Sequence, residues 1–329
     1  MEQFRTSFHI PATLLPFHLQ TPIFSIGSCF ANAMGQRLQQ NKFKVRVNPF
    51  GVIFNPLSIF KLLNASIQPT LAEAMMDSTM MTERQGLWYH YDLHSDFHAE
   101  APSSLAQQLK QSLENTRHFL ANTQVVILTL GTAYAYFLKA NQAIVANCHK
   151  VPQKFFDKRL LSIEEITQGF KDAYSALKTL NPKLQVILTV SPVRHIKDTI
   201  PLNQVSKSTL RLACHQISEQ FDQVTYFPAY ELLLDDLRDY RFFKADMIHP
   251  TSVAEDYIWQ KFSQTFMDES TQGFLKQWGK VRQALNHRSF QPTSPAHQKF
   301  LRKLVQQLKG LSNRIDVSAE LAQVEQQLI

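Results

Sequence analysis

The sequence predicts an α/β protein with a mainly parallel, doubly wound sheet, helices on both faces and a helical C-terminal extension. Continuous apolar runs at residues 125–131 and 186–190 are typical of strands buried on both faces of a parallel sheet. Segments with helical spacing of apolar residues lie between such runs. Strands that alternate with helices in this way imply right-handed crossovers and a doubly wound sheet.

The elements follow one another in a regular order. The first strand, residues 23–27, ends at Gly27, and a helical pattern begins at once. Ser162 and Glu165 form a capping-box pattern at the start of the clearest helix. Further strands are expected at residues 44–48, 125–131, 134–138, 143–146, 186–190 and 224–228. Further helices are expected at residues 56–65, 104–121, 162–180 and 207–221. Residues 69–103 give no clear assignment beyond an extended piece at 86–93 and are a candidate insertion.

The chain changes character near residue 252, where helices take over. We divide it into a domain at residues 1–268 and a helical extension at residues 269–329. The extension is expected to pack on the domain or on a second copy, so its amphipathic helices make a homodimer plausible. The expected helices cover residues 252–267, 270–286, 295–311 and 317–328.

Composition excludes several classes of protein. The 329 residues are 44% hydrophobic and carry a formal net charge of +7, but Lys and Arg are spread along the chain without a basic block. We therefore expect no nucleic-acid partner. The start of the chain lacks an apolar signal region, and no later run is long enough to span a membrane, which favours a soluble, cytoplasmic protein. Three cysteines without a CxxC pair indicate neither a disulfide framework nor a cysteine zinc site.

Ser28 lies at the corner between the first strand and the first helix. In a doubly wound sheet, ligands bind beyond the carboxyl ends of the strands, so this residue faces the expected site. A corner of this kind exposes the free NH groups of a helix start to negative charge, which suits a nucleophile. Serine is also among the commonest helix N-caps, so both interpretations stay open.

A second candidate pair follows the last strand, in a long loop. Asp246 and His249 are three residues apart, and Pro250 restricts His249 to an extended conformation. His249 could take the proton of Ser28 while Asp246 fixes its tautomer, as in a serine–histidine–aspartate triad. Such a pair can equally be a loop hydrogen bond, and the sequence alone leaves that alternative open.

Seven short blocks, taken together, resemble the GSCFA domain family, a branch of the SGNH (GDSL-like) hydrolase superfamily. They span roughly residues 23–262 and comprise residues 27–31, 48–51 with 55–56, 130–133, 147–150, 191–195, 240–242 and 246–250. The resemblance implies a three-layer α/β/α sandwich with a flavodoxin-like sheet and serine-dependent ester hydrolysis without a cofactor. It also implies that Ser28 is the nucleophile and first oxyanion donor, that Gly51 supplies a second backbone donor, and that Asp246 and His249 complete the triad.

One block departs from the superfamily pattern. The third block usually supplies an asparagine to the oxyanion hole, whereas Thr132 follows the glycine here. The hydroxyl or NH of Thr132 could substitute; losing one donor costs about 2–4 kcal/mol of transition-state stabilisation.

Other side chains could also form a functional site. Cys29 could be a thiolate at a helix N-terminus, but we expect it to be a small buried core residue with Ser28 facing the cleft. No histidine pair has the spacing of a helical zinc motif, so we expect no metal. Four further side chains either bind substrate at the rim or satisfy loop hydrogen bonds: His149, Lys150, Arg194 and His195.

The sequence thus predicts a serine hydrolase that removes a small acyl group, possibly an acetyl group, from a carbohydrate-type substrate. Transfer of the acyl group to a sugar hydroxyl would use the same residues. A non-catalytic binding or scaffold protein that keeps the fold is the alternative from another class.

Overall fold

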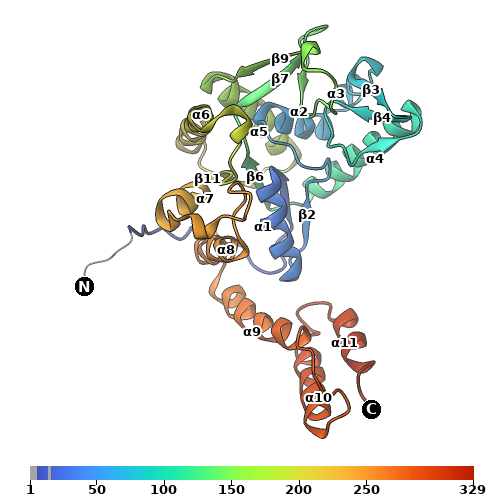
Figure 1. Cartoon of the computed structure of the whole chain (residues 1–329), viewed down its shortest axis with the longest axis vertical. Coiled ribbons are helices and arrows are strands. Elements are labelled where there is room, and N and C mark those ends of the chain that lie inside the picture. Colours follow the sequence, from blue (N-terminus) through green and yellow to red (C-terminus); the bar gives the residue numbers. More distant parts are fainter. Residues whose placement is uncertain (1–5, 14–15) are drawn as a thin grey trace.

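The computed structural model describes residues 6–13 and 16–329 and is organised around one parallel sheet. Its five strands run in the order β11, β10, β6, β1 and β2, and every pairing is parallel (Figure 1). Numbered along the chain, this is the 2-1-3-4-5 order of flavodoxin-like sheets, which confirms the predicted fold class. The strand bounds are β1 Ile23–Gly27, β2 Val45–Val47, β6 Val125–Leu130, β10 Gln185–Val190 and β11 Val224–Tyr226.

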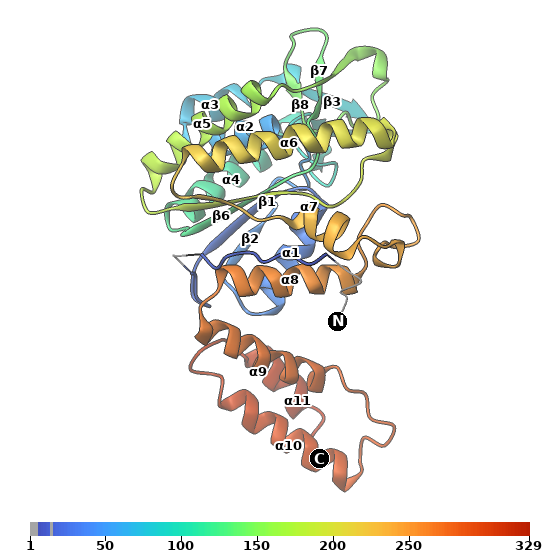
Figure 2. The ribbon, with the colours of Figure 1, turned by 90° about the vertical axis from the view of Figure 1, so that its left-hand side faces the viewer.

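Helices cover both faces of the sheet and complete a three-layer sandwich (Figure 2). Alternate residues of the central strands point to opposite faces. Phe24 and Val126 belong to the core on one side, whereas Ile23 and Val125 belong to the core on the other. The first face is covered by α2 Pro56–Ile67, α4 Pro102–Ala121, α5 Ile163–Leu180 and α6 Ile200–Gln220. The second is covered by α1 Cys29–Gln40, α7 Ala229–Glu231 with the π-helical turn Leu232–Leu237, and α8 Ser252–Phe266.

The helix starts follow from local sequence. Ser162 accepts from the NH of Glu165, and the Glu165 carboxylate accepts from the NH of Ser162, so the predicted capping box is confirmed. Helix α6 is seven residues longer at its start than predicted. Thr199 caps it, and a proline occupies its first turn, where a missing NH costs nothing.

Two small antiparallel sheets lie beyond the main one. The first fills the segment that the sequence left unassigned, and the second contains both strands predicted between residues 134 and 146. The first sheet contains β3 Met81–Arg84, β4 Leu87–His90 and β5 His98–Ala99, with α3 Pro69–Ala74 preceding it. The second contains β7 Tyr134–Leu138, β8 Ile144–Val145 and β9 Phe156–Leu160.

The C-terminal extension comprises three further helices (Figure 1), of which α9 and α11 contact the end of α1 and the turn after it. The indole NH of Trp278 donates to the carbonyl of Gln40 at 2.8 Å. Lys42 pairs with Glu320 at 2.6 Å. The helices are α9 Glu269–Leu285, α10 Pro295–Lys309 and α11 Ser318–Glu325. Packing on the domain is therefore present, and packing on a second copy stays a prediction.

No helix among residues 6–13 and 16–329 is long and apolar enough to cross a membrane. The first five residues, on which the expected lack of a signal region partly depended, lie outside the described residues.

Candidate functional site

Ser28 ends the first strand and begins the first helix, as predicted. It is the N-cap of α1, and its Oγ accepts from the NH of Phe30 at 3.3 Å. Its own NH continues the sheet by donating to the carbonyl of Thr129 at 3.0 Å. Gly27 is required beside it, because a Cβ at this position would lie 2.1 Å from the Thr129 oxygen. The Ser28 side chain is fully buried in this arrangement.

The loop after β2 is fixed directly to this corner by Asn48. The side-chain oxygen of Asn48 accepts from the NH of Gly27 at 2.8 Å, and its amide nitrogen donates to Asn32 at 2.6 Å. Asn48 adopts a left-handed conformation with φ 41°, a region that asparagine tolerates. The predicted first and second blocks of the site are therefore held together by one side chain.

The three predicted oxyanion donors lie on neighbouring segments, but each NH already has an acceptor. The NH of Gly51 donates to Asn48 at 2.9 Å, and the NH of Thr132 donates to Phe54 at 3.1 Å. The Thr132 hydroxyl shares a hydrogen bond with Ser206 at 3.0 Å. With the Ser28 NH engaged in the sheet, an oxyanion could bind here only after some of these bonds open.

Asp246 and His249 form the interaction expected of a base and its orienting carboxylate. His249 Nδ1 donates to Asp246 Oδ2 at 2.8 Å. Asp246 Oδ1 accepts from the NH groups of His249 and Ile248 at 3.0 and 2.9 Å. These backbone hydrogen bonds, followed by that from the imidazole, lower the pKa of Asp246 and keep it ionised. Within the described residues, His249 makes no hydrogen bond to Ser28.

Arg194 and His195 connect the end of β10 to the histidine loop. The Arg194 side chain donates to the carbonyl of Met247 at 3.4 Å, and its guanidinium lies 4.1 Å from the centre of the Phe243 ring. The His195 ring packs edge-on against Phe54 at 5.3 Å. Arg194 therefore contacts the loop that carries the proposed base, and its binding of substrate stays a prediction.

The His195 imidazole is kept neutral by its surroundings. Burial lowers its pKa to about 3, and the electrostatic effects of Lys207, Lys158 and His249 act in the same direction. Its Nε2 is buried and has no hydrogen-bond partner among the described residues. The site therefore contains a buried imidazole that stays neutral and has one unpaired nitrogen.

His149 belongs to the interior of the protein. Its Nε2 donates to the carbonyl of His90 at 2.8 Å, and its Nδ1 lies 3.1 Å from Ser95 Oγ. Its ring stacks on Tyr89 at 5.0 Å, and burial lowers its pKa to about 4. Both nitrogens are therefore occupied by the protein, which corresponds to the loop-bonding alternative rather than to substrate binding. The neighbouring Lys150 is exposed, and its carbonyl accepts from Arg84.

The sequence predicted a buried Cys29 and an accessible Ser28, and the structure shows the reverse. Ser28 is fully buried, whereas Cys29 is half-buried, so the expectation of a buried Cys29 was wrong. The reason is the cap: the Ser28 hydroxyl turns back onto its own helix, which leaves Cys29 as the first residue to emerge from the corner. Burial raises the pKa of the Cys29 thiol, and the positive charge of Lys207 acts in the opposite direction.

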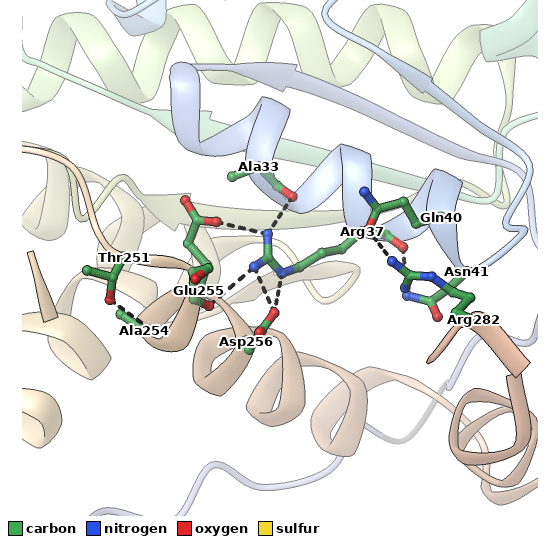
Figure 3. Close-up of polar contacts among 10 residues, drawn as sticks. Ala33, Arg37, Gln40, Asn41, Thr251, Ala254, Glu255, Asp256 and Arg282 are labelled. Atoms are coloured by element: carbon green, nitrogen blue, oxygen red, sulfur yellow. Dashed lines mark hydrogen bonds and ion pairs between the residues drawn. The ribbon is translucent and has the colours of Figure 1, made fainter. Parts of the chain in front are cut away.

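Arg37, which sequence reasoning missed, ties the helix that starts at Ser28 to the helix that follows His249. It extends from α1 to the first turn of α8 (Figure 3). Its guanidinium pairs with Glu255 at 2.9 Å and with Asp256 at 2.8 Å, and it also donates to the carbonyl of Ser252 at 3.4 Å. No local pattern marks this role, because the partners lie more than 200 residues away.

No group of three or more His, Cys, Asp or Glu side chains in the described part of the chain could hold a metal ion. The three cysteines are free.

The fold and the edge of the sheet define a doubly wound α/β protein that carries a serine at its first strand–helix corner and an aspartate–histidine pair in its last long loop. Residues 22–262 match the model of the GSCFA family, and residues 278–329 match that of the GSCFA domain protein, C-terminal domain. The chain belongs to the GSCFA family. It has no significant match among the curated proteins with which it was compared.

Proposed function

We propose that this protein is an SGNH-type ester hydrolase in which Ser28 is the nucleophile and His249 the general base. The observation that carries the proposal is the Asp246–His249 pair. The carboxylate binds Nδ1 at 2.8 Å and leaves Nε2 as the proton acceptor. The position of Ser28 at the carboxyl end of β1, in a chain of the GSCFA family, supports the assignment of the nucleophile.

The proposed reaction has two halves. The Ser28 oxygen attacks the ester carbonyl while His249 Nε2 accepts the hydroxyl proton, which gives a tetrahedral oxyanion. The C–O bond to the alcohol then breaks, and the imidazolium returns the proton to the leaving oxygen. Water repeats the sequence on acyl-Ser28 and releases the carboxylic acid, so the enzyme is regenerated without a net change of protonation.

Catalysis by this mechanism requires a rearrangement at the sheet edge. The Ser28 side chain is buried, and the NH groups proposed as oxyanion donors are engaged with Thr129, Asn48 and Phe54. Catalytic hydrogen bonds in unliganded sites are often loose and form only with substrate. The exposed histidine loop is the segment we propose to move, because it is held to the rest of the edge mainly through Arg194.

The proposed substrate is a small acyl ester, with acetyl on a carbohydrate as the leading class. Acyl transfer to a sugar hydroxyl would use the same first half-reaction and differs only in the nucleophile that resolves acyl-Ser28. A cytoplasmic location and a homodimer stay predictions. A non-catalytic binding role is the outcome that the following experiment would expose.

A fluorophosphonate probe followed by intact mass measurement tests the proposal. We expect one adduct on the wild-type protein, none on Ser28→Ala and an unchanged adduct on Cys29→Ala. Cys29 is the matched control because it adjoins the nucleophile and is the more exposed of the two. Absence of labelling between neutral and mildly alkaline pH would favour the binding role. Loss of labelling only in a folded Cys29→Ala variant would transfer the role to the thiol.

A further inference from the structure

Lys207 is a fully buried lysine that reaches from α6 to the carboxyl ends of two central strands. Its side chain is 1% exposed. The Nζ donates to the carbonyl of Gly131 at 2.6 Å and to the carbonyl of Ser191 at 2.7 Å. These residues directly follow β6 and β10 and belong to two of the blocks proposed for the site. The amine therefore lies beneath the same sheet edge as Ser28.

No carboxylate compensates this amine. Among the ion pairs of the described residues, none includes Lys207. Two carbonyl dipoles are its only hydrogen-bond partners there, and the Tyr230 ring lies 5.8 Å away. An unpaired ammonium in a protein interior is destabilising, so a residue kept there needs a reason beyond stability. Burial accordingly lowers the pKa of Lys207 to about 7.

The charge of Lys207 acts on the corner that carries the nucleophile. Burial is the main influence on the pKa of Lys207, and the electrostatic interaction with Cys29 acts against it by raising that pKa. In the opposite direction, the ammonium lowers the pKa of Cys29. Cys29 follows Ser28 directly, so its thiol can report the charge at this corner.

We propose that Lys207 is a positioning residue whose buried ammonium, held by the Gly131 and Ser191 carbonyls, creates a positive field at the Ser28–Cys29 corner and favours negative charge there. For Cys29 that charge is the thiolate. For Ser28 it is the oxyanion formed during acyl transfer, and this part of the inference rests on the proposed function. The amine does not touch the substrate. It acts through the low dielectric of the interior, where a fixed charge is little screened.

A purely structural role is the competing explanation. In that case Lys207 would only join the ends of β6 and β10 through its two hydrogen bonds. Its removal would then destabilise the fold without changing the ionisation of Cys29. The two explanations therefore differ in a quantity that can be measured without knowing the substrate.

The test measures how fast iodoacetamide alkylates Cys29 as a function of pH. The folded full chain is labelled first, and peptide mass mapping after digestion then identifies the alkylated cysteine. In Lys207→Met we expect Cys29 to react about tenfold more slowly near neutral pH, since an opposite charge in reach lowers a pKa by one unit or more. Cys148 is the internal control. Its pKa is raised to about 11 by burial alone, so its reactivity should not change. Unchanged alkylation of Cys29 in a folded Lys207→Met variant would overturn the proposal.

Lys207→Arg keeps the inference testable if the methionine variant does not fold. Arginine stays charged at all accessible pH values, so the Cys29 profile should lose the inflection near pH 7 that the wild-type lysine produces. An inflection that persists in Lys207→Arg would show that the field has another source.

Fluorophosphonate labelling on the same variants separates this inference from the proposed function. We expect about tenfold slower labelling of Ser28 in Lys207→Met and recovery in Lys207→Arg. Absence of labelling on the wild-type protein would refute the proposed hydrolase function. The alkylation of Cys29 would still decide whether the charge of Lys207 acts on this corner.

Discussion

Replacing Arg37 by methionine should weaken the contact between α1, which begins after Ser28, and α8, which follows the loop of His249. Methionine keeps much of the apolar stem but removes every hydrogen bond between α1 and the first turn of α8 (Figure 3). The Arg37 and Glu255 side chains are only 14% and 15% exposed, so their charges are poorly screened. Asp256 is 71% exposed, so its pairing with Arg37 contributes little.

The magnitude follows from these exposures. Losing a hydrogen-bonded charge partner costs about 1.5–3 kcal/mol, and the exposed Asp256 pair adds at most about 1 kcal/mol. We therefore expect Arg37→Met to lower the free energy of unfolding by about 2–4 kcal/mol. Glu255, which raises the pKa of Cys29, would lose its partner. Alkylation of Cys29 should consequently slow down, a change that loss of packing alone would not cause.

Chemical denaturation of Arg37→Met and Arg159→Met is the assay. Arg159 forms a bidentate pair with Glu165 at 2.7 and 2.8 Å, but the side chains are 48% and 35% exposed. We expect that control to cost less than about 1 kcal/mol. Arg37→Lys should recover only part of the loss, because an ammonium cannot reproduce the forked contacts. If both methionine variants lower the free energy of unfolding by the same small amount, the proposed contribution of Arg37 to the contact between α1 and α8 is refuted.

Three further predictions follow from single positions. Asp246→Asn should slow fluorophosphonate labelling by about a hundredfold or more, because the imidazole loses the carboxylate that fixes its tautomer; a change below threefold, measured by intact mass, would remove Asp246 from the triad. Gly51→Ala should cost at least about 2 kcal/mol more than Gly86→Ala in chemical denaturation. Both glycines have positive φ (77° and 79°), but the new Cβ would lie 2.1 Å from His94 Cβ at Gly51 and meet nothing within 4 Å at Gly86; equal losses would contradict this. Finally, the pKa of Lys207 is about 7 in the folded protein and 10.5 in its reference state, so the unfolded chain binds more protons between these values. Stability should therefore rise with pH in this window, and the slope should be smaller in Lys207→Met, as thermal unfolding across pH would measure; identical slopes would mean that Lys207 is not titrating there.

The main sheet could be predicted from the sequence because the patterns that indicate its strands and helices are local. The apolar runs at β6 and β10 are typical of buried strands, and the capping box at Ser162 marks a helix start that the structure reproduces. The small sheets were harder to predict. Strands such as β5 and β8 are two residues long, which is too short for any periodicity to show.

The candidate site was predictable where it depends on chain position and unpredictable where it depends on distant packing. Ser28 follows the first strand, and Asp246 lies three residues from His249, so both features could be recognised in the sequence. The burial of Ser28 depends on how its cap closes against the sheet, which no spacing encodes. Lys207 was missed because a lysine within a helical pattern is usually solvated, and only the fold turns this one toward the strand ends.

The ion pairs of Arg37 with Glu255 and Asp256 have a consequence for the synthesis of the protein. Its two carboxylate partners follow it by 218 and 219 residues. A growing chain thus carries the proposed alcohol almost from the start but receives the matching imidazole and the carboxylates only near the end of the GSCFA segment. On the proposed mechanism, a translation product that stops before His249 lacks the general base, so hydrolytic competence arises only late in synthesis.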